Sequence, residues 1–148
     1  MRPQPMRPQP MRQAFGDLRV GTRGQGFTDV TGRLAGWLSD EGASDGLLTV
    51  LVRHTSASLT IQENADPDVL ADLSDALDGF APRDGGYRHD AEGPDDMPAH
   101  VRSMLTGATL SVPVRGGRMH LGTWQGVYLI EHRDRPHERS VSLHYVGG

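Results

Sequence analysis

The chain has 148 residues, enough for one domain that buries about 70% of the surface exposed by its unfolded form. It has no cysteine, which excludes disulfides, thiolate metal ligands and a cysteine nucleophile. All 15 basic residues are arginine, so mechanisms that require a lysine are excluded, whereas arginine can still hold phosphate. The net charge of −4 argues against a nucleic-acid-binding surface.

The longest apolar run, residues 47–52, is far shorter than the roughly 18 residues of a membrane helix, and the N-terminus lacks the apolar core of a signal peptide. We therefore expect a cytoplasmic protein that contacts neither membrane nor nucleic acid. The N-terminus repeats Met-Arg-Pro-Gln-Pro at residues 1–5 and 6–10, and proline at this density prevents helix and sheet formation. We expect residues 1–12 to be a disordered tail and residues 13–148 to be a single domain.

The first half of the domain reads as strand, helix and two further strands. The predicted strands span residues 13–21, 47–52 and 56–61, on alternating or continuous apolar residues. Apolar residues at helical spacing predict a helix over 30–38, capped by Thr28 or Asp29.

The second half begins with a helix that starts at Asp66-Pro67 and ends at Gly79. Residues 81–96 lack periodicity and form a long loop, which is often functional, and a short helix follows from about 98 to 105. Four strands are predicted at the end of the chain, over 108–114, 118–121, 127–131 and 140–146. Short turns between neighbouring strands imply antiparallel pairing, so the fold class is α+β, with two or three helices.

Three of the seven histidines stand where a fold does not demand them. His54 precedes a predicted strand, His89 lies in the long loop, and His100 follows Asp96 by four residues, which is one helical turn. Histidine is a common ligand for divalent metals and titrates near neutral pH. The spacings fix no geometry, so a structural role for each histidine remains the alternative.

Two further positions near the C-terminus are candidates. Gly-Thr-Trp-Gln-Gly at 122–126 places Trp124 and Gln125 at a turn, where they would either bind a ligand or form a packed hairpin corner. Glu131 ends an apolar strand, and if it points inward it must be paired or metal-bound, because an isolated buried carboxylate is costly.

Three blocks of the sequence resemble the YjbQ-like family, also called the secondary thiamine-phosphate synthase family. They are His-Thr-Ser-Ala-Ser-Leu-Thr-Ile-Gln-Glu-Asn (54–64, continuing to 69), Tyr-Arg-His-Asp (87–90, continuing to 101) and Leu-Gly-Thr-Trp-Gln-Gly (121–126, continuing to 133). The resemblance implies an antiparallel β-sandwich with helices, assembling as a homotrimer. It also implies a site, in several such proteins with a divalent ion, that is lined by His54, His89, Asp96, His100, Gln125 and Glu131.

The family's label implies that a pyrimidine-methyl diphosphate is joined to a thiazole phosphate, giving thiamine phosphate and diphosphate. A small phosphorylated substrate and a divalent ion, Mg or Zn, fit that chemistry. We expect the metal ligands to be His54, His89 and His100, and the catalytic groups to be His54, Asp96, Gln125 and Glu131. Two alternatives are a metal-dependent hydrolase of a phosphate ester or amide and a non-catalytic trimer that binds a small ligand. Dedicated enzymes for the thiamine step use a TIM barrel of roughly 250 residues, which this chain cannot form.

Overall fold

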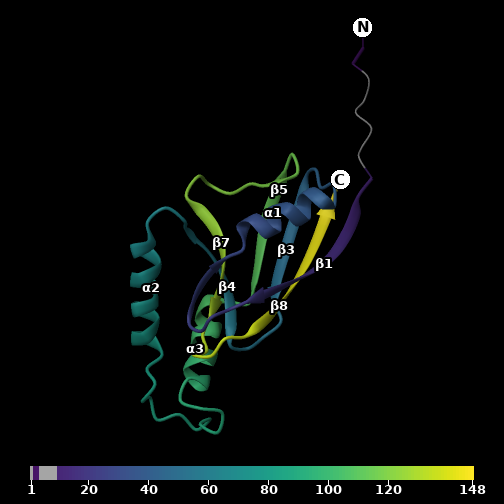
Figure 1. Ribbon diagram of the computed structural model, residues 1–148. Coiled ribbons are helices and arrows are strands. Elements are labelled where there is room, and N and C mark those ends of the chain that lie inside the picture. The colour runs from purple at the N-terminus through teal and green to yellow at the C-terminus, as the bar shows by residue number, and fades with distance from the viewer. Residues whose placement is uncertain (1, 4–9) are drawn as a thin grey trace.

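The computed structural model describes residues 2–3 and 10–148, which fold into two antiparallel β-sheets and three helices (Figure 1). Sheet A has the strand order β1 (Arg12–Gly21), β8 (Glu138–Gly147), β3 (Gly46–Val52), β5 (Thr109–Arg115) and β6 (Arg118–Met119). Sheet B has the order β2 (Gly26–Asp29), β7 (Gln125–Glu131) and β4 (Ala57–Glu63). The helices are α1 (Thr31–Asp40), α2 (Pro67–Phe80) and α3 (Asp96–Thr106).

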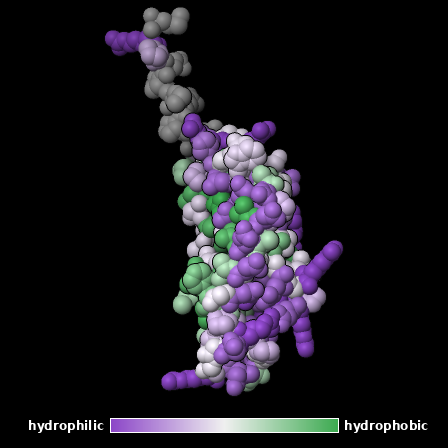
Figure 2. Space-filling view, turned by 90° about the vertical axis from the view of Figure 1, so that its left-hand side faces the viewer, coloured by the Kyte–Doolittle hydropathy of each residue, from purple (hydrophilic) through white to green (hydrophobic). Residues whose placement is uncertain are grey.

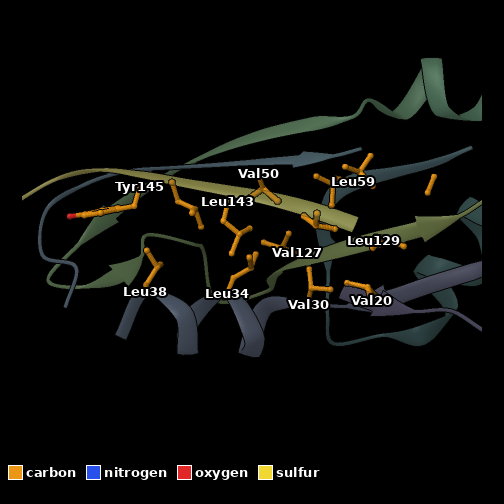
Figure 3. Packing of buried hydrophobic residues seen from close by; sticks show 14 of the residues in the cluster. Val20, Val30, Leu34, Leu38, Val50, Leu59, Val127, Leu129, Leu143 and Tyr145 are labelled. Carbon is orange, nitrogen blue, oxygen red and sulfur yellow. The ribbon is translucent and has the colours of Figure 1, made fainter. Parts of the chain in front are cut away.

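The hydrophobic core lies between the two sheets and α1 (Figure 3). Alternate residues of β3 and β8 point into it from sheet A, as the period of two in a strand requires. Leu34 and Leu38, one turn apart on α1, are both fully buried. Burial of each such side chain contributes about 1.5–3 kcal/mol. Sheet B adds Leu59, Val127 and Leu129.

Helices α2 and α3 lie on the other side of sheet B (Figure 1). Asp66 caps α2, since its side chain accepts a hydrogen bond of 2.9 Å from the amide of Asp68, and Pro67 occupies the first turn. No residue of α2 is buried, whereas α3 buries Asp96 and Arg102 among others. The strand β7 therefore lies between the core and the helical layer, and six of its seven residues are buried.

The predicted α+β class, the antiparallel pairing and the irregular long loop are confirmed. Strand β2 was not predicted, because its four residues resemble a helix cap. Asp29 does bond the amide of Thr31, but α1 starts one residue later than expected, after Val30. Helix α3 starts at Asp96, earlier than the predicted residue 98.

Most of the predicted N-terminal tail, residues 1 and 4–9, lies outside the described residues. Arg12, which was assigned to the tail, is the first residue of β1. None of the helices in the described part of the chain combines the length and the apolar character needed to cross a membrane.

Candidate functional site

A cluster of three side chains forms where the long loop joins α3. His89 Nε2 lies 2.6 Å from Asp96 Oδ2, and His100 Nε2 lies 3.3 Å from the same oxygen. The two imidazole rings meet edge-on, with centroids 5.4 Å apart. One ligand atom from each residue falls within 4.8 Å of the others, and this is the group of metal-ligating side chains found among the described residues.

The local sequence explains why these three residues meet. Asp96 and His100 are four residues apart on α3 and therefore project from the same face of the helix. His89 comes from the loop before α3, which turns back over the first turn of the helix. Asp96 is buried, whereas His89 is exposed and His100 is half-buried, so the cluster opens to solvent on the imidazole side.

Arg133 fixes the buried acid from behind. Its Nη1 donates to Asp96 Oδ1 at 2.7 Å, its Nε donates to Asp95 Oδ2 at 2.9 Å, and its Nη2 donates to the carbonyl oxygen of Glu92 at 3.0 Å. The amide of Asp134 also donates to Asp95, at 2.9 Å. With Oδ1 of Asp96 held in this way, Oδ2 is turned toward the two histidines.

Nearby positive charges and hydrogen-bond donors keep the carboxyl groups of Asp95 and Asp96 ionised. Burial alone would raise the pKa of Asp96, but the hydrogen bond from His89 and the positive charge of Arg133 outweigh it and lower that pKa. The pKa of Asp95 is lowered to about 2, because the hydrogen bonds from Arg133 and the Asp134 amide outweigh burial. Asp96 is therefore a carboxylate at neutral pH, the form that binds a cation.

Glu131 lies one layer deeper, in a buried ion pair. Arg139 Nε donates to its Oε1 at 2.8 Å, and Arg139 Nη2 bonds Oε2. The hydroxyl of Thr22 donates at 2.7 Å and the amide of Arg133 at 3.2 Å. Despite its burial, these donors lower the pKa of Glu131. Glu131 thus fixes the backbone from which Arg133 reaches the cluster.

His54 borders this deeper layer and is not part of the cluster. Its Nε2 accepts a hydrogen bond of 2.8 Å from the amide of Ser140, which occupies that lone pair. Burial and the charge of Arg139 lower the pKa of His54, so the ring is neutral. His137 also lies beside Glu131, with Nδ1 3.5 Å from Oε1.

Gln125 lies at the opposite end of β7 from Glu131, about 20 Å away at the usual rise of a strand. Its Oε1 accepts a hydrogen bond of 2.7 Å from the amide of Gly122 and so closes the turn. Trp124 beside it is 63% exposed. Within one chain, the structure does not bring the Trp-Gln turn to the histidine cluster.

The geometry of the cluster fits a small transition-metal ion. Ligand atoms about 2.0–2.1 Å from a tetrahedral zinc ion lie about 3.3 Å from one another. The 3.3 Å between His100 and Asp96 already matches this, and the 2.6 Å between His89 and Asp96 requires a small widening. The three ligand atoms together spread over no more than 4.8 Å, so shifts of the side chains alone would bring them to this spacing. Two imidazoles and one carboxylate suit zinc or iron better than magnesium, which prefers oxygen ligands, and three protein ligands leave a position open.

The chain matches the family described as UPF0047 protein YjbQ-like over residues 17–148. It belongs to this family. A UPF0047 protein of Synechocystis sp. is 51% identical over 131 residues, which cover 88% of this chain and 89% of the relative. The UPF0047 protein YjbQ of Escherichia coli O157:H7 is 44% identical over 117 residues, covering 78% and 85% of the two chains.

Solved structures share the YjbQ-like fold. A hypothetical protein of Aeropyrum pernix has a TM-score of 0.83 at 35% identity, covering 91% of this chain and 99% of its own. A YbjQ-like protein of unknown function from Sulfolobus solfataricus has a TM-score of 0.86, covering 93% and 99%, and at 24% identity it shows the fold alone. The YjbQ-like β-sandwich expected from the sequence is thereby confirmed.

The site of this YjbQ-like chain also contains groups that sequence reasoning missed. Arg133 follows Glu131 by two residues at the end of β7, and Asp95 precedes Asp96 directly. The one sequence signal for Asp95 is its place in a pair of acids just before a helix. Nothing in the sequence pairs Arg133 with residues 37 or 38 positions earlier, because that contact depends on how α3 packs beside the end of β7.

Proposed function

We propose that this YjbQ-like chain binds one divalent transition-metal ion, zinc rather than magnesium, and acts on small phosphorylated substrates. The observation that supports it is the convergence of His89, Asp96 and His100 within 4.8 Å, with Asp96 buried and oriented by Arg133. A second residue that hydrogen-bonds a metal ligand and orients it, as Arg133 does with Asp96, is typical of functional metal sites. His54 as a further ligand, and Glu131 and Gln125 as catalytic groups, remain predictions.

Two cavities beside the cluster match a substrate that has a ring and a polar group. One, of about 190 Å³, is lined by His89, Tyr87, Met97 and Pro98, among others, and has room for a single ring. The other, of about 500 Å³, is polar, and its wall contains Arg133, Arg135 and His137 together with the acids Glu92, Asp95 and Asp134. Both cavities include Gly93 and Pro94 in their walls, so one extended ligand could lie across this segment.

The reaction that we propose first is the joining of a pyrimidine-methyl diphosphate to a thiazole phosphate. A bound metal ion would neutralise negative charge on the departing diphosphate. The residues of the chain would hold the ion, line the ring cavity and keep Asp96 ionised. A homotrimer is part of this proposal, and sedimentation equilibrium of the purified protein would test it.

The test of the metal site is elemental analysis of the purified, untagged protein. We expect near-stoichiometric zinc or another divalent transition metal in the wild type and its loss in His89→Ala and His100→Ala. His120→Ala, which changes an exposed histidine elsewhere, is the matched control and should retain the metal. A wild type that stays empty after divalent ions are added back would contradict the proposal.

The test of the reaction is incubation of the metal-loaded protein with both substrates, and with each alone. Thiamine phosphate that forms only when both are present, and that is lost in His100→Ala, would support the synthase. The open ligand position of a three-ligand site also favours a hydrolase that uses water. Release of phosphate or diphosphate from one substrate alone would support the hydrolase, and saturable binding without turnover would support the ligand-binding trimer.

A further inference from the structure

A groove runs between α2 and sheet B, and the proposed function does not use it. Its apolar part, of about 170 Å³, is lined by Phe27 and Ile130 from the sheet and by Leu73 and Phe80 from α2, among others. Its polar part, of about 40 Å³, is lined by side chains that include Gln25, Ser74, Arg102 and His132. Both parts share Phe27, Leu77 and Ile130, so they form one feature, which we call the α2 groove.

The helix above the groove is poorly buried. No residue of α2 is buried, and Phe80 is 71% exposed although it lines the apolar part. Figure 1 shows α2 as the outermost layer beside sheet B, and Figure 2, from that side, shows a hydrophilic band with apolar patches beside it. Asp68, Asp72 and Asp75 of α2 are exposed to solvent, whereas Leu73 and Leu77 line a space that the described residues do not fill.

Arg102, at the polar end of the groove, has a single ion pair among the described residues. Its side chain is only 6% exposed, and its one ion pair joins Nη2 to Oδ1 of Asp78 at 2.6 Å, whose own side chain is 63% exposed. Among the buried side-chain nitrogen and oxygen atoms of the described residues, Arg102 Nε is the one that has no hydrogen-bond partner. Because Asp78 lies mostly in solvent, it balances the charge of the buried guanidinium only in part, so this end of the groove favours a further anion beside Arg102.

The other ionisable side chains of the polar wall are either neutral or already paired with an arginine. Burial, with the nearby charge of Arg102, lowers the pKa of His132 to about 4, so the ring is neutral, and its Nε2 lies 2.7 Å from Ser58 Oγ. The carboxylate of Glu131 is occupied by Arg139 and other donors. The charges that line the polar end are therefore Arg102, the exposed Asp78, and Glu131, whose charge is balanced by Arg139.

We propose that the α2 groove binds a small amphiphilic anion, with a carboxylate at Arg102 and a short alkyl chain or single ring against Phe27, Leu73 and Phe80. A cavity of about 150 Å³ is known to accommodate benzene, so the apolar part has the right size for one ring or about eight carbons. Charge-assisted bonds from arginine to a carboxylate supply the specificity for the head group.

The groove is distinct from the metal cluster. Arg102 follows His100 by two residues, which turns its side chain about 200° around α3. The proposal therefore does not depend on the metal or on the reaction. Working with protein treated with EDTA keeps the two sites apart, because a carboxylate then has no metal ion to bind.

The experiment is isothermal titration calorimetry of the EDTA-treated wild type with octanoate. We expect saturable binding of one octanoate per chain, and affinity at least about tenfold lower for octanol, which lacks the charge, and for propanoate, which lacks the chain. Arg102→Gln should lower octanoate affinity at least about tenfold, since a charged hydrogen bond contributes that much. Arg115→Gln, an exposed arginine on β5, is the matched control and should bind like the wild type.

A second variant keeps the proposal testable if Arg102→Gln does not fold. Ala76 is exposed on α2 and lines the apolar part, so Ala76→Trp should fill the groove without disturbing the core and should abolish octanoate binding. A wild type that does not bind octanoate, or a Trp variant that binds it normally, would overturn the proposal. If the wild type binds none and Ala76→Trp changes the sedimentation mass, the groove is a contact between copies of the chain instead.

Discussion

Replacing Arg133 with glutamine tests the support behind the cluster. The substitution removes the donors to Asp95 and Asp96, whose side chains are only 10% and 3% exposed. Breaking a buried ion pair from one side costs about 3–5 kcal/mol, and we expect about 3 kcal/mol because 21% of the Arg133 side chain is exposed. If the cluster holds a metal, its affinity should fall about 10- to 100-fold, the usual effect of losing a supporting partner.

The same substitution should change the response to acid. In the wild type the folded-state pKa of Asp95 is about 2, below its usual value of 3.8, so the stability that this group contributes is present above pH 3.8 and is lost as the pH falls toward 2. Without Arg133 the side-chain hydrogen bond and the positive charge that lower this pKa are lost, and only backbone donors such as the Asp134 amide remain. The variant should therefore lack most of the stabilisation that the wild type keeps above pH 3.8.

Urea unfolding at several pH values measures the stability, and competition with a chromophoric chelator measures zinc affinity. Arg118→Gln, on the exposed strand β6, is the control for loss of one arginine. A variant at Arg133 that unfolds at the wild-type urea midpoint and binds zinc with wild-type affinity would refute the reasoning, because it would show that Asp96 needs no support from this side.

Three further predictions concern the fold around the site. The wild type should lose about 3 kcal/mol of its free energy of unfolding as the pH falls from 6.5 to about 4, because the unfolded state binds a proton at His132 before the folded state, whose pKa is about 4. His132→Gln should abolish this loss, and urea titrations of both proteins at several pH values measure the difference. Arg139→Met should cost about 3–5 kcal/mol by leaving Glu131 buried and unpaired, and the double replacement with Glu131→Leu should recover part of it in a double-mutant cycle. Gly46→Ala should cost at least about 1–3 kcal/mol, seen as a lower melting temperature, because the new Cβ would lie 2.2 Å from the carbonyl oxygen of Val146; an unchanged midpoint would contradict that packing.

Local patterns were sufficient to predict most of the elements. The helix at Asp66-Pro67 has its cap and its proline in the sequence, and the structure places both where expected. Strand β2 escaped because a four-residue edge strand carries almost no periodicity and is defined by its pairing with β7. The early start of α3 escaped because Asp96 is held by tertiary contacts with Arg133 and His89, not by a cap of its own.

The candidate site was predictable where its geometry is local. Asp96 and His100 are one helical turn apart, so their proximity follows from the sequence once the helix is placed correctly. His89 was a candidate because of its residue type, its place in the long loop and the family resemblance, but only the path of the loop brings it to Asp96. The sequence also required that an inward Glu131 be paired or metal-bound, and the structure pairs it with Arg139.

The resulting arrangement has a physical logic in three layers. The innermost pair, Glu131 and Arg139, is nearly fully buried and fixes the end of β7. The middle layer is Arg133, whose amide bonds Glu131 and whose guanidinium bonds Asp96. The outer layer is the open cluster at the surface of α3. Arg133 at the rigid end of β7 holds Oδ1 of Asp96, so Oδ2 is already oriented before anything binds to it. A metal ligand requires such preorganisation.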